Sequence, residues 1–137
     1  MSYAMILVTA AALAACSRGG YGPTDSGNPS PSAQTVSVRV GETAAVGGTG
    51  VTIAFLRVTE ESRCPLNVVC VWEGNGQVAL TLSTAYLTRD VALNTTTEPR
   101  KTVFAGLGIA LSALDPYPTG EPIDGDDYVA TFQIDAD

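Results

Sequence analysis

Residues 35–40 read TVSVRV, in which every second residue is valine. Because successive side chains of an extended chain point to opposite faces, this alternation predicts a half-buried β-strand. Residues 77–83 (QVALTLS) alternate in the same way and predict a strand that buries Val78, Leu80 and Leu82. After the first 34 residues, no segment of helical length places apolar residues at the 3.6-residue repeat of a helix. The period of two predicts an all-β fold.

Further strand patterns lie between and beyond these two. Residues 51–59 (VTIAFLRVT) are largely apolar on both faces, which predicts a central strand. Residues 128–134 (YVATFQI) alternate again, and weaker patterns occupy residues 43–46, 86–93, 102–104 and 107–111. Seven or eight short strands separated by turn residues predict an immunoglobulin-like antiparallel β-sandwich, with a small β-barrel as the second choice.

The N-terminus has the pattern of an export signal. Residues 4–15 (AMILVTAAALAA) are apolar, but the run is shorter than the ~20 residues that a membrane-spanning helix needs. Such a length suits the apolar region of a signal peptide. The run ends in Leu13-Ala14-Ala15-Cys16, which resembles the lipobox of bacterial lipoproteins. The resemblance implies cleavage before Cys16 and a lipid thioether on its sulfur.

Two details qualify the lipoprotein pattern. Residues 1–5 carry no Lys or Arg, whereas signal peptides normally begin with positive charge. Ser17 follows the cysteine and is not the Asp that retains many lipoproteins in the inner membrane. The predicted location is therefore the cell envelope, with the outer membrane favoured and the domain facing the periplasm or the exterior.

The chain divides into three predicted parts. Residues 1–15 form the signal peptide, and residues 16–34 form a lipid-anchored linker rich in Ser, Gly and Pro. A segment of that composition buries too little apolar surface to offset the entropy of ordering. Residues 35–137 form the β-sandwich domain.

Charge and composition exclude several classes of function. Seven Lys and Arg stand against fourteen Asp and Glu, which gives a net charge of −7. A surface with this balance repels phosphate backbones, so nucleic acid is excluded as a partner. The chain contains no His, which removes Ser-His-Asp and Cys-His catalysis and the commonest metal ligand. We predict no metal ion and no cofactor.

Two cysteines remain once Cys16 is assigned to lipid. Cys64 and Cys70 then form an even pair in an oxidising compartment, so a disulfide is the expected state. The loop that such a bridge closes is short, and its stabilisation is on the order of 2 kcal/mol. The bridge is expected to shape a loop more than to hold the fold together.

The segment around these cysteines is the most distinctive of the chain. Residues 63–74 read RCPLNVVCVWEG, which resembles a motif of small exported or lipid-anchored bacterial proteins that are largely uncharacterised. The motif is R-C-P, four residues, C, any residue, W, any residue, G. Weaker likeness is found at residues 93–95 and 127–128. The resemblance implies export and a β-domain, and it implies no mechanism.

Two interpretations of Trp72 remain open at the level of sequence. In the first, Trp72 packs over the disulfide or covers an open end of the sandwich, as large aromatic residues beside cystines often do. In the second, a rigid loop presents Trp72, Arg63 and Asn75 to a partner, because aromatic residues and Arg dominate binding hot spots.

Carboxylates provide two further candidate sites. Asp124, Asp126 and Asp127 form an acidic turn with oxygen ligands for Ca²⁺, but their spacing does not match an EF-hand loop. Glu60, Glu61 and Glu73 converge if the strands on either side of the cysteine loop pair. A carboxylate pair can hydrolyse glycosides, although this requires a cleft.

The leading hypothesis is a non-catalytic protein that is anchored to the membrane through Cys16. Its disulfide-rigidified loop is expected to bind an unknown envelope protein or a glycan. The first alternative is a proteinaceous protease inhibitor, since small sandwiches can insert rigid loops into clefts. The second is a hydrolase that uses the carboxylates described above.

Overall fold

The computed structural model describes residues 34–136, which form β-strands and one short 3₁₀ helix. This part of the chain contains no α-helix, and it holds no helix long and apolar enough to cross a membrane. The predicted all-β fold is confirmed. The strands are β1 (Gln34–Arg39), β2 (Thr43–Val46), β3 (Val51–Glu61), β4 (Gly76–Ser83), β5 (Thr88–Asn94), β6 (Lys101–Phe104), β7 (Leu107–Asp115) and β8 (Val129–Ala136), and the 3₁₀ helix η1 is Gly125–Asp127.

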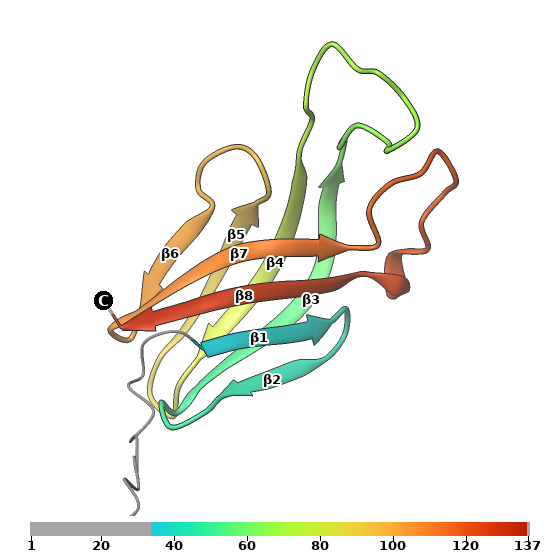
Figure 1. The fold of residues 1–137 in the computed structure, drawn as a ribbon. Coiled ribbons are helices and arrows are strands. Elements are labelled where there is room, and N and C mark those ends of the chain that lie inside the picture. Colours follow the sequence, from blue (N-terminus) through green and yellow to red (C-terminus); the bar gives the residue numbers. More distant parts are fainter. Residues whose placement is uncertain (1–33, 137) are drawn as a thin grey trace, which may run out of the picture.

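The eight strands form two four-stranded antiparallel sheets, so the predicted β-sandwich is also confirmed. One sheet has the order β1-β8-β7-β6 and the other the order β2-β3-β4-β5. The strands of one sheet run across those of the other (Figure 1). Every pair of neighbouring strands is consecutive in sequence, apart from β1 and β8. The Greek-key connections of an immunoglobulin domain are therefore not found among these strands.

The strand order is that of an up-and-down barrel, the second predicted architecture, but the barrel is not closed. Eight strands that follow chain order, with the last beside the first, have the order of an up-and-down barrel. Here the hydrogen-bonded ladder is interrupted between β1 and β2 and between β5 and β6. The barrel is therefore not closed, and the strands form two separate layers.

The core lies between the two sheets and follows the predicted alternation. In β4 the buried side chains are Val78, Leu80 and Leu82, as expected. Three phenylalanines from different strands, Phe55, Phe104 and Phe132, are the largest fully buried side chains. Full burial of one such side chain is worth roughly 1.5–3 kcal/mol, so this shared core holds the two layers together.

The predicted central strand is confirmed, because β3 lies between β2 and β4 in its sheet, although only one of its faces is buried. Val51, Ile53 and Phe55 are buried, whereas Leu56 on the other face is exposed. The pairing of β3 with β4 is irregular between Phe55 and Arg57 and again between Val58 and Glu60. A bulge bends a strand and re-aims its side chains, which the sequence pattern alone does not reveal.

Strand boundaries differ from the predictions by a few residues. β1 begins at Gln34, one residue early, and β7 continues to Asp115 rather than ending at residue 111. β5 begins only at Thr88, and Tyr86 lies in the preceding turn, where it is 99% exposed. The signal peptide, Cys16 and the linker up to residue 33 lie outside the described residues.

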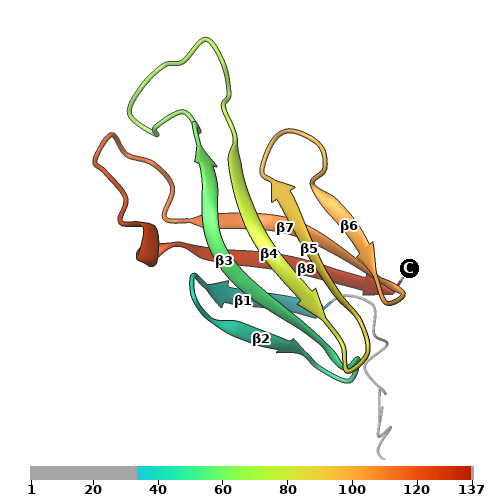
Figure 2. The same ribbon diagram turned by 180° about the vertical axis from the view of Figure 1, so that it is seen from behind.

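The first described residue lies far from the loop that joins β3 to β4. The Gln34 side-chain amide donates to the carbonyl of Gly47 at 2.8 Å, beside the start of β3. β3 has eleven residues, and at about 3.3 Å per residue it separates its two ends by roughly 30 Å. Figures 1 and 2 both show the β3–β4 loop at the opposite end of the sandwich from the start of β1.

Candidate functional site

The loop that joins β3 to β4, residues 62–75, contains the whole of the distinctive motif. We call it the cysteine loop. Cys64 and Cys70 are bonded to each other with a Cα–Cα distance of 5.9 Å, which confirms the predicted disulfide. Below the disulfide the two arms remain paired: Ser62 N donates to Asn75 O at 2.8 Å, and Cys64 N donates to Glu73 O at 3.1 Å. The loop therefore has a regular base and a cross-linked tip.

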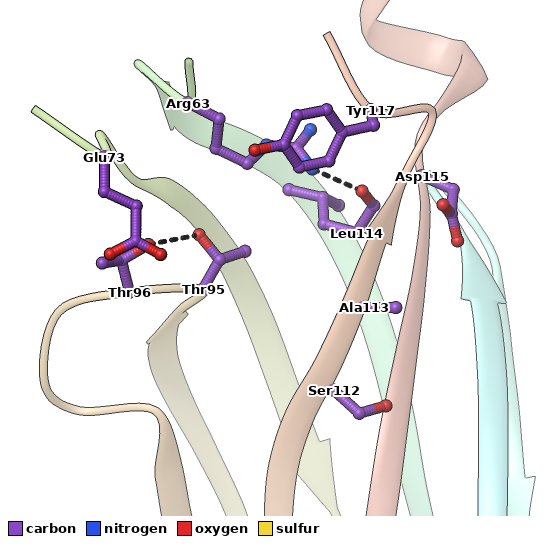
Figure 3. A pocket seen from close by; sticks show the side chains of 9 residues that line it. All are labelled: Arg63, Glu73, Thr95, Thr96, Ser112, Ala113, Leu114, Asp115 and Tyr117. Atoms are coloured by element: carbon purple, nitrogen blue, oxygen red, sulfur yellow. Dashed lines mark hydrogen bonds between the residues drawn. The ribbon is translucent and has the colours of Figure 1, made fainter. Parts of the chain in front are cut away.

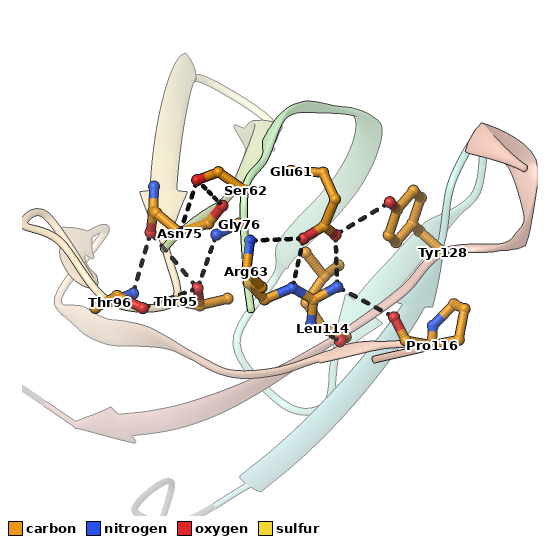
Figure 4. Close-up of polar contacts among 10 residues, drawn as sticks. All are labelled: Glu61, Ser62, Arg63, Asn75, Gly76, Thr95, Thr96, Leu114, Pro116 and Tyr128. Carbon is orange, nitrogen blue, oxygen red and sulfur yellow. Dashed lines mark hydrogen bonds and ion pairs between the residues drawn. The ribbon is translucent and has the colours of Figure 1, made fainter. Parts of the chain in front are cut away.

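Arg63 holds one side of this base against the other sheet. Its guanidinium donates to both carboxylate oxygens of Glu61, at 2.9 and 2.6 Å. It also donates to the carbonyl oxygens of Leu114, near the end of β7, and of Pro116, just beyond that end (Figure 4). The Arg63 guanidinium lies over the Tyr117 ring, with its central carbon 4.9 Å from the ring centroid. All the polar groups of Arg63 thus face protein atoms, and the residue is only 7% exposed.

Glu61 is also held by Tyr128, whose hydroxyl donates to it at 3.0 Å. Burial raises the pKa of Glu61, but the hydrogen bonds and positive charge of Arg63 outweigh burial, and its pKa lies below the ordinary value. Burial and the Glu61 carboxylate raise the pKa of Tyr128 to about 12. Glu61 is therefore ionised at neutral pH, whereas the general acid of a glycoside hydrolase needs a raised pKa.

Asn75 fastens the other side of the loop base. Its side-chain amide donates to Asn94 at 2.9 Å and to Glu60 at 3.2 Å. Its side-chain oxygen accepts from the backbone N–H groups of Thr96 and Thr97, at 3.1 and 3.4 Å. Asn75 is 4% exposed, so it joins the cysteine loop to the neighbouring β5–β6 loop from within.

The prediction that Arg63 and Asn75 are presented on the loop together with Trp72 is therefore wrong. Both side chains are buried, and their hydrogen-bonding groups are used within the domain. A partner that approaches the loop from solvent meets neither side chain as a principal contact. Their place in the motif is explained by the loop base that they hold.

Gly74 is required by the close approach of the two arms of the loop. It has φ +73°, and a Cβ at this position would lie 1.8 Å from the carbonyl oxygen of Ser62. We expect Gly74→Ala to lower the free energy of unfolding by roughly 2–4 kcal/mol, from backbone strain and steric clash together. Urea unfolding followed by circular dichroism measures this loss.

Gly48 supplies the matched control for this substitution. Its φ is +74°, but no atom lies within 4 Å of an added Cβ. Gly48→Ala is expected to cost only the left-handed backbone conformation, roughly 1–2 kcal/mol. Equal losses for the two variants would show that the close approach at Gly74 has no energetic weight.

The tip of the cysteine loop is apolar and exposed. Trp72 is 81% exposed, Val71 89% and Val69 fully exposed. The interpretation that Trp72 packs over the disulfide or the end of the sandwich is therefore wrong. We define the apolar tip as the five exposed apolar residues of the loop, Leu66, Val68, Val69, Val71 and Trp72. Exposed apolar patches of this kind mark interaction sites in soluble domains.

A cavity of about 280 Å³ lies beside the loop base. Figure 3 shows Glu73 and Thr96 on one wall, with Arg63 and Tyr117 on the other. A second cavity of about 450 Å³ lies between the cysteine loop and residues 118–123 of the β7–β8 loop. Pockets therefore flank the loop on two sides, and the apolar tip projects beyond them.

The carboxylates singled out in the sequence do not form a common group. Asp124 accepts a hydrogen bond from Asp126 N and begins the short helix η1, and Asp127 pairs with Arg39 at 3.4 Å. Glu60 and Glu61 are engaged by Asn75 and Arg63. Within residues 34–136, no three His, Cys, Asp or Glu side chains are placed to hold a metal ion.

The segments of weaker likeness meet the motif at the loop base. Asn94 receives the Asn75 amide, the Thr95 hydroxyl accepts from Gly76 N at 2.8 Å, and Tyr128 binds Glu61. The contact between Glu61 and Tyr128 is not predicted by the sequence, in which Glu61 is a candidate carboxylate beside the motif and Tyr128 belongs to a segment of weaker likeness. Comparisons with protein-family models, curated proteins and solved structures find no match for the chain.

Proposed function

We propose that this protein is a non-catalytic binding module of the bacterial cell envelope, anchored through Cys16. The lipobox-like sequence before Cys16 supports the anchor, and the Cys64–Cys70 disulfide supports an oxidising compartment. The cysteine loop projects from the end of the sandwich opposite the start of β1 (Figure 1). A domain tethered through its N-terminus would thus hold this loop away from the membrane.

The observation that carries the proposal is the exposure of the apolar tip on a fixed base. Burial of a large apolar side chain stabilises a fold by roughly 1.5–3 kcal/mol, and Trp72 forgoes most of that gain in the isolated domain. The disulfide, the Arg63 contacts and the Asn75 contacts restrict the loop before any partner binds. Restriction before binding lowers the entropic cost of association. Trp72 would act as the main anchor, since Trp is the residue most enriched in binding hot spots.

Trp72→Ala tests the proposal. Because Trp72 packs on little of the domain, the substitution is expected to change the free energy of unfolding by less than about 0.5 kcal/mol. A partner recovered from envelope extracts by the full-length protein should lose at least about tenfold in affinity, as at a hot spot worth more than 1.4 kcal/mol. Quantitative pull-down and thermal melts measure the two effects.

Tyr86 gives the matched control, because it is an aromatic residue at least as exposed as Trp72 but lies in the β4–β5 turn, away from the cysteine loop. Tyr86→Ala should leave recovery unchanged. If Trp72→Ala unfolds the domain, or if both variants recover every partner equally, the apolar tip is not the binding surface.

A protease inhibitor is the second candidate, and the convex shape of the loop favours it. Figures 1 and 2 show the loop projecting beyond the strands, as a segment must to enter a concave active site. Titration against periplasmic and extracellular proteases tests this candidate. Inhibition that disappears in Trp72→Ala would support this candidate. The absence of inhibition for every protease in the panel would eliminate it.

A further inference from the structure

The net charge of the chain is concentrated around the cysteine loop. Residues 60–75 and 115–128 together contain eight acidic residues and one basic residue, whereas the rest of the chain contains six of each sign. These two segments therefore account for the full net charge of −7. The acidic residues are Glu60, Glu61, Glu73, Asp115, Glu121, Asp124, Asp126 and Asp127.

The two acidic segments lie side by side. Leu66 N donates to Pro118 O at 3.0 Å, and Tyr128 donates to Glu61 at 3.0 Å. The one basic residue, Arg63, is buried against Glu61 and presents no positive charge to solvent. Apart from the Arg39–Asp127 pair, the two segments beside the apolar tip thus expose negative charge only, and the neighbouring β5–β6 loop carries one charge of each sign, Glu98 and Arg100.

Glu73 is the acidic residue placed best to meet a partner. It follows Trp72 directly and lines the 280 Å³ cavity, opposite Tyr117 (Figure 3). Within residues 34–136, its carboxylate takes part in none of the hydrogen bonds or ion pairs of the domain. A free carboxylate beside an apolar anchor and a cavity is suited to accept the ammonium or guanidinium group of a partner side chain.

We infer that the partner of this loop is a protein segment that combines Lys or Arg with apolar side chains. The inference rests on the proposed function and adds the chemical class of the partner. Burial of the apolar tip provides affinity, and the acidic surroundings select a basic surface and speed its approach. The same negative charge disfavours two other partners of the apolar tip. Anionic lipid headgroups would be repelled by it, and a second copy of the chain would bring like charges together.

A peptide-display selection on the immobilised full-length protein tests the inference without a known partner. A random library is selected on the unmodified protein, on Trp72→Ala and on Tyr86→Ala. Peptides that bind the unmodified protein and Tyr86→Ala, but not Trp72→Ala, are expected to be basic and to contain aromatic or large aliphatic residues. If these Trp72-dependent peptides are neutral or acidic, the charge inference is wrong and the proposed function stands. If no peptide depends on Trp72, the proposed function fails as well.

Calorimetry on one selected peptide then measures the contribution of charge. Glu73→Gln with Glu121→Gln should weaken binding by roughly tenfold at low salt, because each substitution removes one exposed charge pair with the basic peptide. Glu42→Gln with Asp135→Asn removes the same charge outside the two segments and should change affinity less than about twofold. Equal effects of the two double variants would overturn the inference.

The other occupants are tested directly. The full-length protein is incorporated by its lipid into one set of vesicles, and its ability to bind a second set, of phosphatidylethanolamine and phosphatidylglycerol, is measured by vesicle aggregation. Its self-association in detergent is measured by analytical ultracentrifugation. Aggregation or self-association that Trp72→Ala abolishes would overturn the inference in favour of a membrane or a second copy.

Discussion

Arg63→Ala is expected to lower the free energy of unfolding by about 2–4 kcal/mol, because a buried guanidinium loses several charge-assisted hydrogen bonds together with its packing. Arg63 is almost completely buried, with a bidentate contact to Glu61. Its loss leaves the Glu61 carboxylate without its main partner and removes the Arg63 donors from the carbonyl groups of Leu114 and Pro116. The link between the end of β3 and the β7–β8 loop would then be broken.

Urea unfolding of Arg63→Ala measures this loss, with Arg39→Ala as the control. Arg39 forms the other ion pair of residues 34–136, with Asp127, and both side chains of that pair are more than half exposed. An exposed pair contributes only about 0.2–1 kcal/mol. Arg63→Met combined with Glu61→Leu should recover much of the loss, since both charges are removed together. If Arg63→Ala costs no more than Arg39→Ala, Arg63 does not hold the loop base.

Asn75→Ala is expected to cost about 2–4 kcal/mol, because a buried polar network loses its central member. The Asn75 side chain donates to Glu60 and Asn94 and accepts from the N–H groups of Thr96 and Thr97. None of these four contacts can be replaced by a methyl group. The β5–β6 loop should loosen together with the cysteine loop.

Asn67→Ala is the control for this second substitution. Asn67 lies in the same loop, between the two cysteines, and is exposed. It should cost less than about 0.5 kcal/mol. Amide hydrogen exchange provides the local readout: Thr96 and Thr97 should lose protection in Asn75→Ala and keep it in Asn67→Ala. Unchanged protection at both residues in Asn75→Ala would contradict the network.

The sequence predicted the layers of the fold because burial alone decides them. Val78, Leu80 and Leu82 alternate with polar residues, and the period of two puts them on one face whatever the strand order. The order itself depends on which edges pair, which the pattern does not encode. The irregular pairing of β3 with β4 is not encoded in the pattern either, and an apolar residue such as Leu56 gives no sign that the outer face of its sheet is uncovered.

The sequence predicted the segment that forms the site, but it did not predict which of its side chains are exposed. The motif located the cysteine loop, and the compartment argument predicted the disulfide. The sequence groups Arg63 and Asn75 with Trp72 on one loop, and aromatic residues and Arg dominate binding hot spots. The burial of Arg63 and Asn75 depends on Glu61, Asn94 and residues of the β7–β8 loop, most of them distant in sequence. Residue type suggested that Arg63 and Asn75 are exposed to a partner, whereas their tertiary contacts place them in the base of the cysteine loop.

Together these contacts separate a base that is fixed by polar side chains from a tip that is free to bind. Trp72 is the only tryptophan of the chain, so its fluorescence reports on the tip alone. Acrylamide quenching of the folded protein, compared with the same protein in urea, measures how far the indole is open to solvent. Because Trp72 is exposed, we expect nearly equal quenching in the two states and an emission maximum close to that of the unfolded chain. A blue-shifted emission with quenching well below that of the unfolded chain would show that Trp72 is packed, and the apolar tip would not exist as a binding surface.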